Sequence, residues 1–157
     1  MTVAFRNVTA RPTDPVGEWP TEAVRAALER GGLSEWRRIA EAIRSSPWGR
    51  TARQVEEVLS HSRPYGVAEL LERTIATARG RAEAAERQAV ADELRALIAS
   101  AGTTQAEFAR RIGTSAPRLS SYVNAAVVPS ATLMVRARKV AAGLMSARDS
   151  GRPKGRT

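Results

Sequence analysis

Residues 116–121 combine side chains that can form hydrogen bonds with small apolar side chains. The Arg118 guanidinium group can donate two parallel hydrogen bonds, a geometry that matches O6 and N7 on the edge of guanine. Ser120 and Ser121 can donate or accept a hydrogen bond, and Ala116 and Pro117 can contact the methyl group of thymine. We therefore predict that these residues read base edges in the major groove of double-stranded DNA.

A capped helix just before this stretch would help to position it. Thr104 can cap the start of that helix, and Glu107 follows at the spacing of a capping box. Phe108, Ala109 and Ile112 then fall on one helix face. The pattern predicts a short amphipathic helix.

A tight turn and a second helix follow the first. Gly113 suits the left-handed residue that commonly ends a helix, and Thr114 or Ser115 can cap the next one. Leu119 and Tyr122 can face the first helix at i and i+3. This arrangement leaves the predicted base-reading residues on the outer surface.

The stretch 103–124 resembles the Cro and cI repressor-like helix-turn-helix family, also called the XRE family. The family pattern is a Thr-Gln helix start, a hydrophobic-Ala pair, a glycine turn and a serine-rich recognition helix, here residues 116–124. The resemblance covers about residues 91–144, which implies a lambda-repressor-like DNA-binding domain. The residues that match are Gln105, Phe108, Ala109, Gly113, Leu119, Ser120 and Asn124.

The resemblance also implies contacts with the DNA backbone. Gln105 stands where the family contacts a phosphate, and the free amides at a helix start reinforce such a contact. Asn124 and Ser130 are implied to hold the backbone on either side of the loop after the recognition helix. Together with Thr104 and Arg136, these form the predicted phosphate-binding set.

Several of these residues also have a purely structural interpretation. Ser120 can be small only to let two helices approach, Gln105 can be a capping residue, and Arg118 can be a solvated surface charge. The sequence also departs from the family: Ala125 replaces the glycine that usually ends the recognition helix. We expect Asn124 to adopt the left-handed conformation instead.

Net charge favours a polyanionic partner. The 157 residues include 25 Lys and Arg against 16 Asp and Glu, a net charge of +9. Residues 81–157 hold +7 of it and residues 1–80 only +2. Nucleic acid is the expected partner, and a membrane surface is its rival.

Composition argues against several other classes of protein. The chain has no cysteine, which excludes disulfides and cysteine-bound zinc, and its single histidine, His61, has no suitable carboxylate pair beside it. We therefore predict a protein that is not an enzyme and has no catalytic residue, metal or cofactor. No apolar run is long enough to span a membrane, so we expect a cytoplasmic, nucleoid-associated protein.

Helical periodicity divides the rest of the chain. Residues 1–20 contain three prolines and predict an irregular arm, and residues 21–80 predict a bundle of four short helices that dimerises or binds a protein. Residues 81–144 predict a connector helix followed by the helix-turn-helix domain, and residues 145–157 a disordered basic tail. The fold class is therefore all-α.

These observations predict a sequence-specific transcriptional regulator, a repressor that binds double-stranded DNA as a homodimer. Two alternatives stay open. The first is an antitoxin-like autoregulator whose residues 21–80 bind a protein partner, which the tryptophans of that half favour. The second is a nucleoid-packaging protein, which the basic composition favours.

Overall fold

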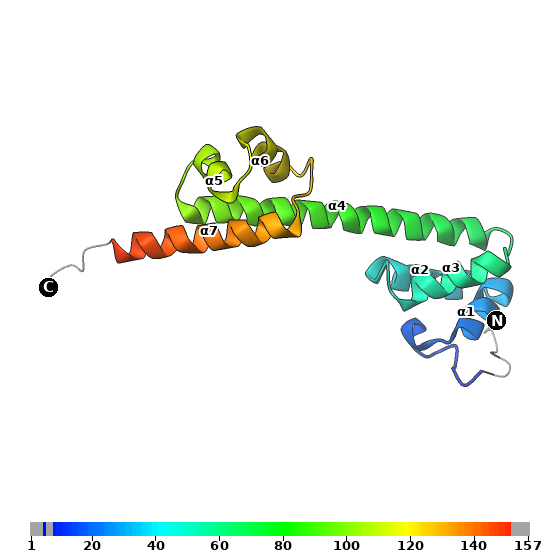
Figure 1. The fold of residues 1–157 in the computed structure, drawn as a ribbon. Helices are drawn as coiled ribbons and strands as arrows, with labels where there is room; N and C mark the ends of the chain where they lie inside the picture. Colours follow the sequence, from blue (N-terminus) through cyan, green and yellow to red (C-terminus); the bar gives the residue numbers. More distant parts are fainter. Residues whose placement is uncertain (1–4, 6–7, 152–157) are drawn as a thin grey trace. The chain divides into compact units, whose positions relative to one another are not determined.

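The fold of the described residues is entirely helical, as predicted (Figure 1). The computed structural model describes residue 5 and residues 8–151. These residues form two compact units, within Met1–Glu83 and Ala84–Thr157. The division falls inside one long helix, whereas the sequence predicted a limit after Gly80. Each unit has a hydrophobic core of its own.

Unit 1 is a small bundle of short helices. It contains η1 (Val16–Glu18), α1 (Thr21–Arg30), α2 (Leu33–Ser45), α3 (Arg50–His61) and the first part of α4 (Val67–Ala101). Apolar side chains at helical spacing meet in its core, because each helix is amphipathic. Its fully buried members include Val24, Leu28, Ile39, Ile43, Val55, Val58 and Leu71.

Described residues of the predicted irregular arm contribute to this core. Trp19 is fully buried, and its indole nitrogen donates a hydrogen bond to the Asp14 carbonyl oxygen at 3.0 Å. The Arg38 guanidinium group lies 5.0 Å from the centre of the Trp19 ring, and Phe5 meets the same ring edge-on. The prolines predicted an irregular backbone, and they gave no sign that Trp19 packs in the core.

Aromatic residues of unit 1 do not all pack inside it. Trp36 is half-buried and donates a hydrogen bond to the Ala27 carbonyl oxygen at 3.0 Å. Trp48 is 45% exposed and Tyr65 is fully exposed, in the turns before α3 and α4. These two aromatic side chains therefore do not pack in the core of unit 1.

The start of α2 differs from the prediction. The sequence pattern favours Ser34 as the cap of this helix, but Gly32 is the N-cap residue and Leu33 the first helical residue. The Glu35 carboxylate accepts a hydrogen bond from the Gly32 amide at 2.9 Å. This bond satisfies an amide at the helix start without a capping hydroxyl group.

Helix α4 runs without a break from Val67 to Ala101, a length of 35 residues. The sequence predicted a helix end near Arg79, because Gly80 usually weakens a helix. Gly80 nevertheless keeps a negative φ. Good helix formers, mainly alanine, glutamate and arginine, follow it and outweigh its cost of about 1 kcal/mol.

Unit 2 contains the last part of α4 together with α5 (Gln105–Ile112), α6 (Ala116–Val123) and α7 (Ala131–Ser150). Its core joins all four helices, so that α5 and α6 are held on a frame of longer helices. The largest fully buried members are Leu94, Phe108, Ile112 and Leu119.

Helix α7 continues past the predicted start of a disordered tail at residue 145. It ends at Ser150, because residues such as Ala141, Leu144 and Met145 favour a helix. The Arg148 guanidinium group also donates a hydrogen bond to the Ser100 carbonyl oxygen at 3.3 Å. The tail prediction for residues 152–157 lies outside the described residues.

Candidate nucleic-acid interface

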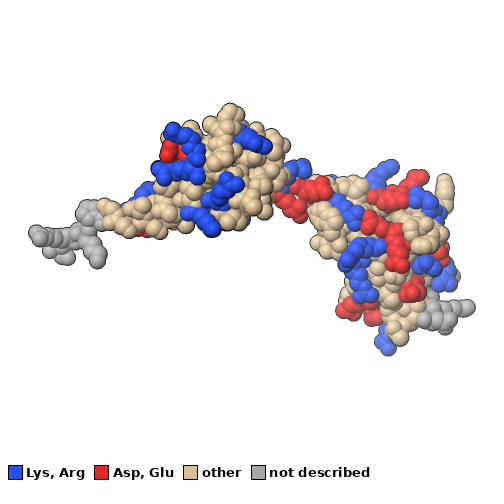
Figure 2. Space-filling model, in the orientation of Figure 1, with Lys and Arg blue, Asp and Glu red and all other residues tan. Residues whose placement is uncertain are grey.

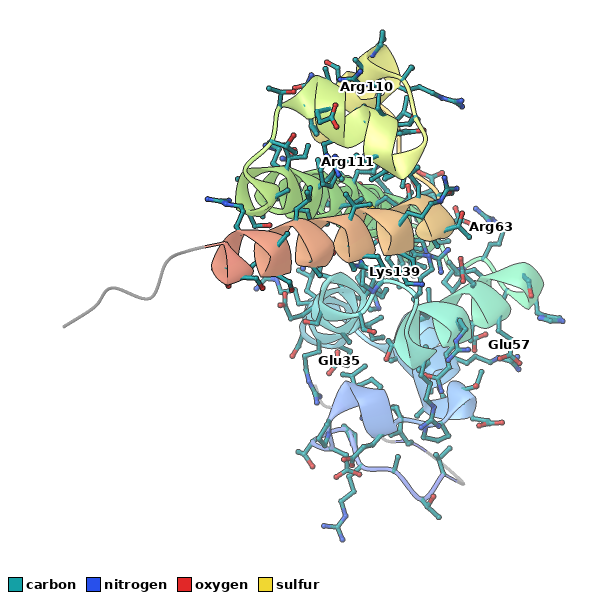
Figure 3. The ribbon with its side chains drawn as sticks, turned by 60° about the vertical axis from the view of Figure 1, so that its left-hand side comes forward. Glu35, Glu57, Arg63, Arg110, Arg111 and Lys139 are labelled. Carbon is teal, nitrogen blue, oxygen red and sulfur yellow. The ribbon has the colours of Figure 1, made fainter. Side chains whose placement is uncertain are left out.

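Helix α5 begins with the predicted hydroxyl cap. The Thr104 hydroxyl oxygen accepts a hydrogen bond from the Glu107 amide at 3.2 Å. The second half of the expected capping box is absent, because the Glu107 carboxylate accepts hydrogen bonds from Arg110 at 2.5 Å and Arg111 at 2.9 Å. Figure 3 labels these two arginines of α5. Glu107 therefore stabilises its own helix through i, i+3 and i, i+4 ion pairs.

The turn between α5 and α6 has the predicted glycine. Gly113 has a φ of 79°, the left-handed conformation, and its amide donates to the Arg110 carbonyl oxygen at 3.2 Å. The Ser115 hydroxyl oxygen then accepts from the Arg118 amide at 3.3 Å and caps α6. The two helices are thus joined by a short turn with both ends capped.

Packing fixes which faces of these helices turn inward. Phe108, Ala109 and Ile112 of α5 are fully buried. Leu119 of α6 is fully buried and Tyr122 is 8% exposed, as predicted. Because these side chains share the core of unit 2, the opposite face of α6 must point outward.

The outer face of α6 holds the predicted base-reading residues. Successive helix residues turn by about 100°, so Pro117 and Ser121 lie near the centre of this face, opposite the buried residues. Ala116 and Arg118 lie on its two flanks. Ala116, Pro117 and Arg118 are exposed, whereas Ser120 and Ser121 are half-buried. All five predicted residues therefore reach the surface of one helix.

The hydrogen bonds within α6 leave donors and acceptors of these side chains available to a ligand. The Ser121 hydroxyl donates to the Pro117 carbonyl oxygen at 3.2 Å, and its oxygen can still accept. The Ser120 oxygen accepts from the Asn124 side-chain amide at 3.4 Å. Arg118 forms no ion pair within the described part of the chain, so its guanidinium group is available.

Four of the five predicted phosphate-binding residues lie at helix ends. Thr104 and Gln105 are exposed at the start of α5, and Asn124 is exposed at the end of α6. Ser130 caps α7, its hydroxyl oxygen accepting from the Leu133 amide at 3.2 Å. At the starts of α5 and α7, first-turn amides are available to an anion.

Arg136 has a structural role that the sequence did not indicate. Its guanidinium group donates a hydrogen bond to the Ile112 carbonyl oxygen at 2.9 Å, which ties α7 to the last residue of α5. The side chain is exposed and has further donors. It can hold the turn in place and still meet a phosphate.

The left-handed residue after the recognition helix is Ala125, with a φ of 56°. The sequence predicted this conformation for Asn124, but the φ of Asn124 is −94°. The prediction was wrong because the chain must reverse one residue later, where the family usually has glycine. A left-handed alanine costs about 1–2 kcal/mol, since its Cβ approaches the carbonyl oxygen.

The two units differ in surface charge. On the visible face of unit 2, Lys and Arg gather with few acidic residues, whereas both signs alternate over unit 1 (Figure 2). One unit 2 pair links α4 to α7: Arg138 donates to Glu93 at 2.6 Å and 3.2 Å. These hydrogen bonds lower the pKa of Glu93 and raise that of Arg138.

Two apolar residues beside this surface were not predicted from the sequence. Val127 and Val128 are each 53% exposed, in the loop between Asn124 and Ser130. They follow the end of a helical pattern and belong to no periodic pattern themselves. Only their apolar character could have indicated a role in binding.

Two other features are absent from the part of the chain that the structure describes. It contains no group of three or more His, Asp or Glu side chains that could hold a metal ion. None of its helices is both long and apolar enough to cross a membrane.

Comparison with known proteins identifies one segment. Residues 94–140 match a family model described as helix-turn-helix. This range contains the last part of α4, the helices α5 and α6 and the first half of α7, which are the elements that build the surface described above. Neither the curated proteins nor the solved structures gave a match to the chain.

Proposed function

We propose that this chain, whose residues 94–140 are an XRE-family helix-turn-helix segment, is a sequence-specific repressor of transcription. DNA binding and transcription regulation are the general functions of the segment. The observation that supports sequence reading is the outer face of α6, where hydrogen-bonding groups lie on a rigid, capped helix. The proposed role is one of binding, without catalysis, a metal or a cofactor.

In the proposed complex, α6 lies in the major groove of double-stranded DNA. Pro117 and Ser121 face the base edges, and Arg118 reaches guanine from the flank of the helix. The starts of α5 and α7 meet phosphates through Gln105 and Ser130, which fixes the register of α6. Repression then follows from occupation of a promoter, and the cytoplasmic nucleoid is the proposed location.

A homodimer would place two copies of α6 on an inverted repeat. Half-sites centred about 34 Å apart present their major grooves on the same side of the duplex. Selection of bound sequences from a random DNA pool tests this proposal directly. We expect an inverted repeat with that spacing, whereas equal binding to random and selected DNA would indicate a nucleoid-packaging protein instead.

Arg118→Ala tests the base-reading role. We expect it to lose about 1–3 kcal/mol of discrimination at one base pair, since a bidentate contact is removed. Titrations against operator variants measure this loss. Arg53→Ala is the matched control, because Arg53 is exposed on α3 in unit 1. An unchanged ranking of operator variants in Arg118→Ala would rule out base reading by this residue.

A second proposed function assigns partner binding to residues 21–80, as in an antitoxin-like autoregulator. It is supported by the large apolar side chains that unit 1 exposes: Leu33 is 63%, Trp48 45% and Tyr65 fully exposed. Exposed aromatic residues are enriched at protein interfaces. Co-purification of the tagged full chain with a stoichiometric protein partner would favour this function, whereas self-association through the same residues would favour dimerisation.

A further inference from the structure

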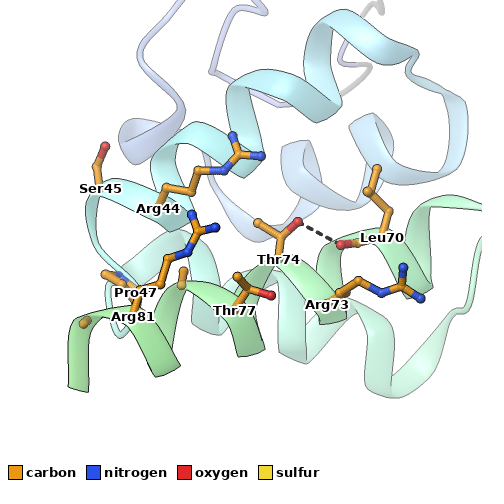
Figure 4. A pocket seen from close by; sticks show the side chains of 10 residues that line it. Arg44, Ser45, Pro47, Leu70, Arg73, Thr74, Thr77 and Arg81 are labelled. Carbon is orange, nitrogen blue, oxygen red and sulfur yellow. Dashed lines mark hydrogen bonds between the residues drawn. The ribbon is translucent and has the colours of Figure 1, made fainter. Parts of the chain in front are cut away.

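A groove in unit 1 lies between the end of α2 and one face of α4 (Figure 4). We call it the arginine groove, and its volume is about 590 Å³. It is open to solvent along one side. Its lining residues are Arg44, Ser45, Pro47, Leu70, Arg73, Thr74, Thr77, Ala78, Arg81 and Ala82.

The groove collects positive charge without a matching negative charge. Arg44 comes from the end of α2, whereas Arg73 and Arg81 come from α4 (Figure 4). No acidic residue is part of the lining. Arg44 has one contact with Glu41 at 3.5 Å, and neither Arg73 nor Arg81 forms an ion pair with any described residue. The three guanidinium groups thus have free hydrogen-bond donors.

Other arginines of unit 1 are paired with carboxylates, as a neighbouring hollow shows. There Arg63 donates two hydrogen bonds to Glu72, at 2.7 Å and 3.0 Å. Arg79 likewise donates two to Glu56, at 2.6 Å and 3.0 Å. Both glutamates line that hollow with their arginines. Arg63 and Arg79 are therefore paired with carboxylates in that hollow, whereas Arg73 and Arg81 line the groove without a carboxylate partner among the described residues.

Apolar and hydroxyl groups complete the lining. Leu70, which is 47% exposed, and Pro47 supply apolar groups to the lining. The Thr74 hydroxyl donates to the Leu70 carbonyl oxygen at 2.8 Å, so it turns an oxygen lone pair outward. Ser45 and Thr77 add two more hydroxyl groups. An occupant that carries both carboxylates and apolar side chains would match these groups.

We propose that the arginine groove binds an acidic, partly apolar segment of a protein partner. The inference rests on the proposed partner-binding function of residues 21–80 and states the chemistry of that partner. Charge complementarity supports it, since guanidinium groups bind carboxylates with paired hydrogen bonds. The open side favours a segment of a larger molecule, because small ligands usually need burial of most of their surface.

A peptide-binding experiment on the full chain tests the proposal. The probe is a fluorescein-labelled peptide of alternating glutamate and leucine, and its reference replaces every glutamate by glutamine. Fluorescence anisotropy measures both affinities. The groove variant is Arg73→Glu with Arg81→Glu. The matched control, Arg37→Glu with Arg53→Glu, makes the same charge change at exposed positions of α2 and α3 outside the groove.

We expect the groove variant to bind the glutamate peptide about tenfold more weakly than the unchanged protein, and the control to stay within about twofold. A peptide of lysine and leucine should show the reverse preference and bind the groove variant more tightly. An equal loss in both variants would overturn the proposal, because it would show a general effect of charge.

Other occupants give different results and would also overturn the proposal. Inorganic phosphate that raises the thermal midpoint through Arg73 and Arg81, with no peptide binding, would identify a small-anion site. Binding of duplex DNA that depends on these two arginines, again without peptide binding, would identify an extension of the DNA-binding surface.

Co-purification with the full chain distinguishes failure of the groove proposal from failure of the proposed partner-binding function. A partner that stays bound to the groove variant would show that partner binding stands and that the groove is the wrong surface. Absence of any partner together with absence of peptide binding would contradict both proposals. Operator binding, measured on the same samples, should be unchanged in the groove variant.

Discussion

Single residues at the two ends of α6 determine how well the proposed recognition helix is stabilised. Ala125 takes a left-handed conformation directly after α6 and Asn124, at a point where glycine would be unstrained. Beside it, Asn124 and Ser120 are joined by a hydrogen bond at 3.4 Å. The exit from the recognition helix is therefore strained, while its entry at Ser115 is capped.

Ala125→Gly should stabilise unit 2. We expect a gain of about 0.5–1 kcal/mol, because relief of the left-handed strain exceeds the added entropy of glycine in the unfolded chain. Chemical denaturation followed by circular dichroism measures the change. Ala126→Gly is the control, since Ala126 does not have a positive φ and should lose stability. A loss of similar size in both variants would contradict strain at Ala125.

The caps around α5 and α6 could be predicted from sequence because their signals are local. A hydroxyl at Thr104 or Ser115 and a glycine at position 113 act within a few residues, and the structure has each of them in place. The left-handed Ala125 was missed, since alanine itself carries no such signal and only the glycine of the resembled family marks the position. The bond from Arg136 to Ile112 could not be predicted, because it joins residues far apart in the chain.

At the scale of elements, two helices are longer than the sequence suggested. Gly80 lies inside α4 and Gly143 inside α7, and neither ends its helix. A glycine signal predicts a helix end only when the following residues fail to pack or to propagate the helix. The residues after Gly80 propagate it without a break, and Leu94 and Ala101, farther along, enter the core of unit 2.

Gly80→Ala should stabilise the chain by about 0.5–1 kcal/mol, the usual difference between these residues inside a helix. A methyl group at this position would meet no atom within 4 Å apart from its chain neighbours and the nearby backbone of its own helix. Thermal unfolding followed by circular dichroism measures the gain. Gly113→Ala is the opposite control: Gly113 is left-handed, so the same change should destabilise unit 2. A destabilised Gly80→Ala variant would show that α4 is not continuous there.

The pair that joins α4 to α7 predicts a dependence on pH. Arg138 lowers the pKa of Glu93 chiefly by hydrogen bonding, so the pair contributes stability above the unfolded pKa of about 4.3. This contribution is lost as the pH falls through the lower pKa of the folded state.

Glu93→Gln should therefore reduce stability at pH 7 and flatten the loss of stability between about pH 5 and pH 3. Denaturation at a series of pH values measures both effects. Glu83→Gln is a control, because Glu83 forms no ion pair among the described residues. The same pH profile in both variants would show that the pair with Arg138 has no energetic role.

At the scale of the whole molecule, charge and apolar surface are divided between the two units. Residues 81–157 carry a net charge of +7, and the elements of the helix-turn-helix lie among them. Residues 1–80 are close to neutral and expose Trp48 and Tyr65. Composition alone revealed the division of charge, whereas the exposure of Trp48 and Tyr65 could be found only in the structure. The arginine groove was not predictable, because it needs residues of α2 and α4 to meet in space.

Lys139 is exposed on α7, in the more basic of the two units, so Lys139→Glu should weaken binding to random-sequence duplex DNA and reduce its dependence on salt concentration. Removal of one ionic interaction with a phosphate lowers the slope of log affinity against log salt by about 0.9. Arg53→Glu in unit 1 makes the same charge change, and we expect it to leave the slope unaltered. The measurement is a salt titration of both variants, and an equal effect would show that the two units attract DNA alike.

The packing of Trp19 in unit 1 has a spectroscopic consequence. All three tryptophans, Trp19, Trp36 and Trp48, belong to unit 1, whereas the aromatic residues of the unit 2 core are Phe108 and Tyr122. Indole emission excited at long wavelength therefore reports on one unit alone, and the buried Trp19 ring should give a red shift when that unit opens. Unfolding of the two cores can therefore be distinguished without a label, by comparing tryptophan emission with the circular dichroism of the whole backbone.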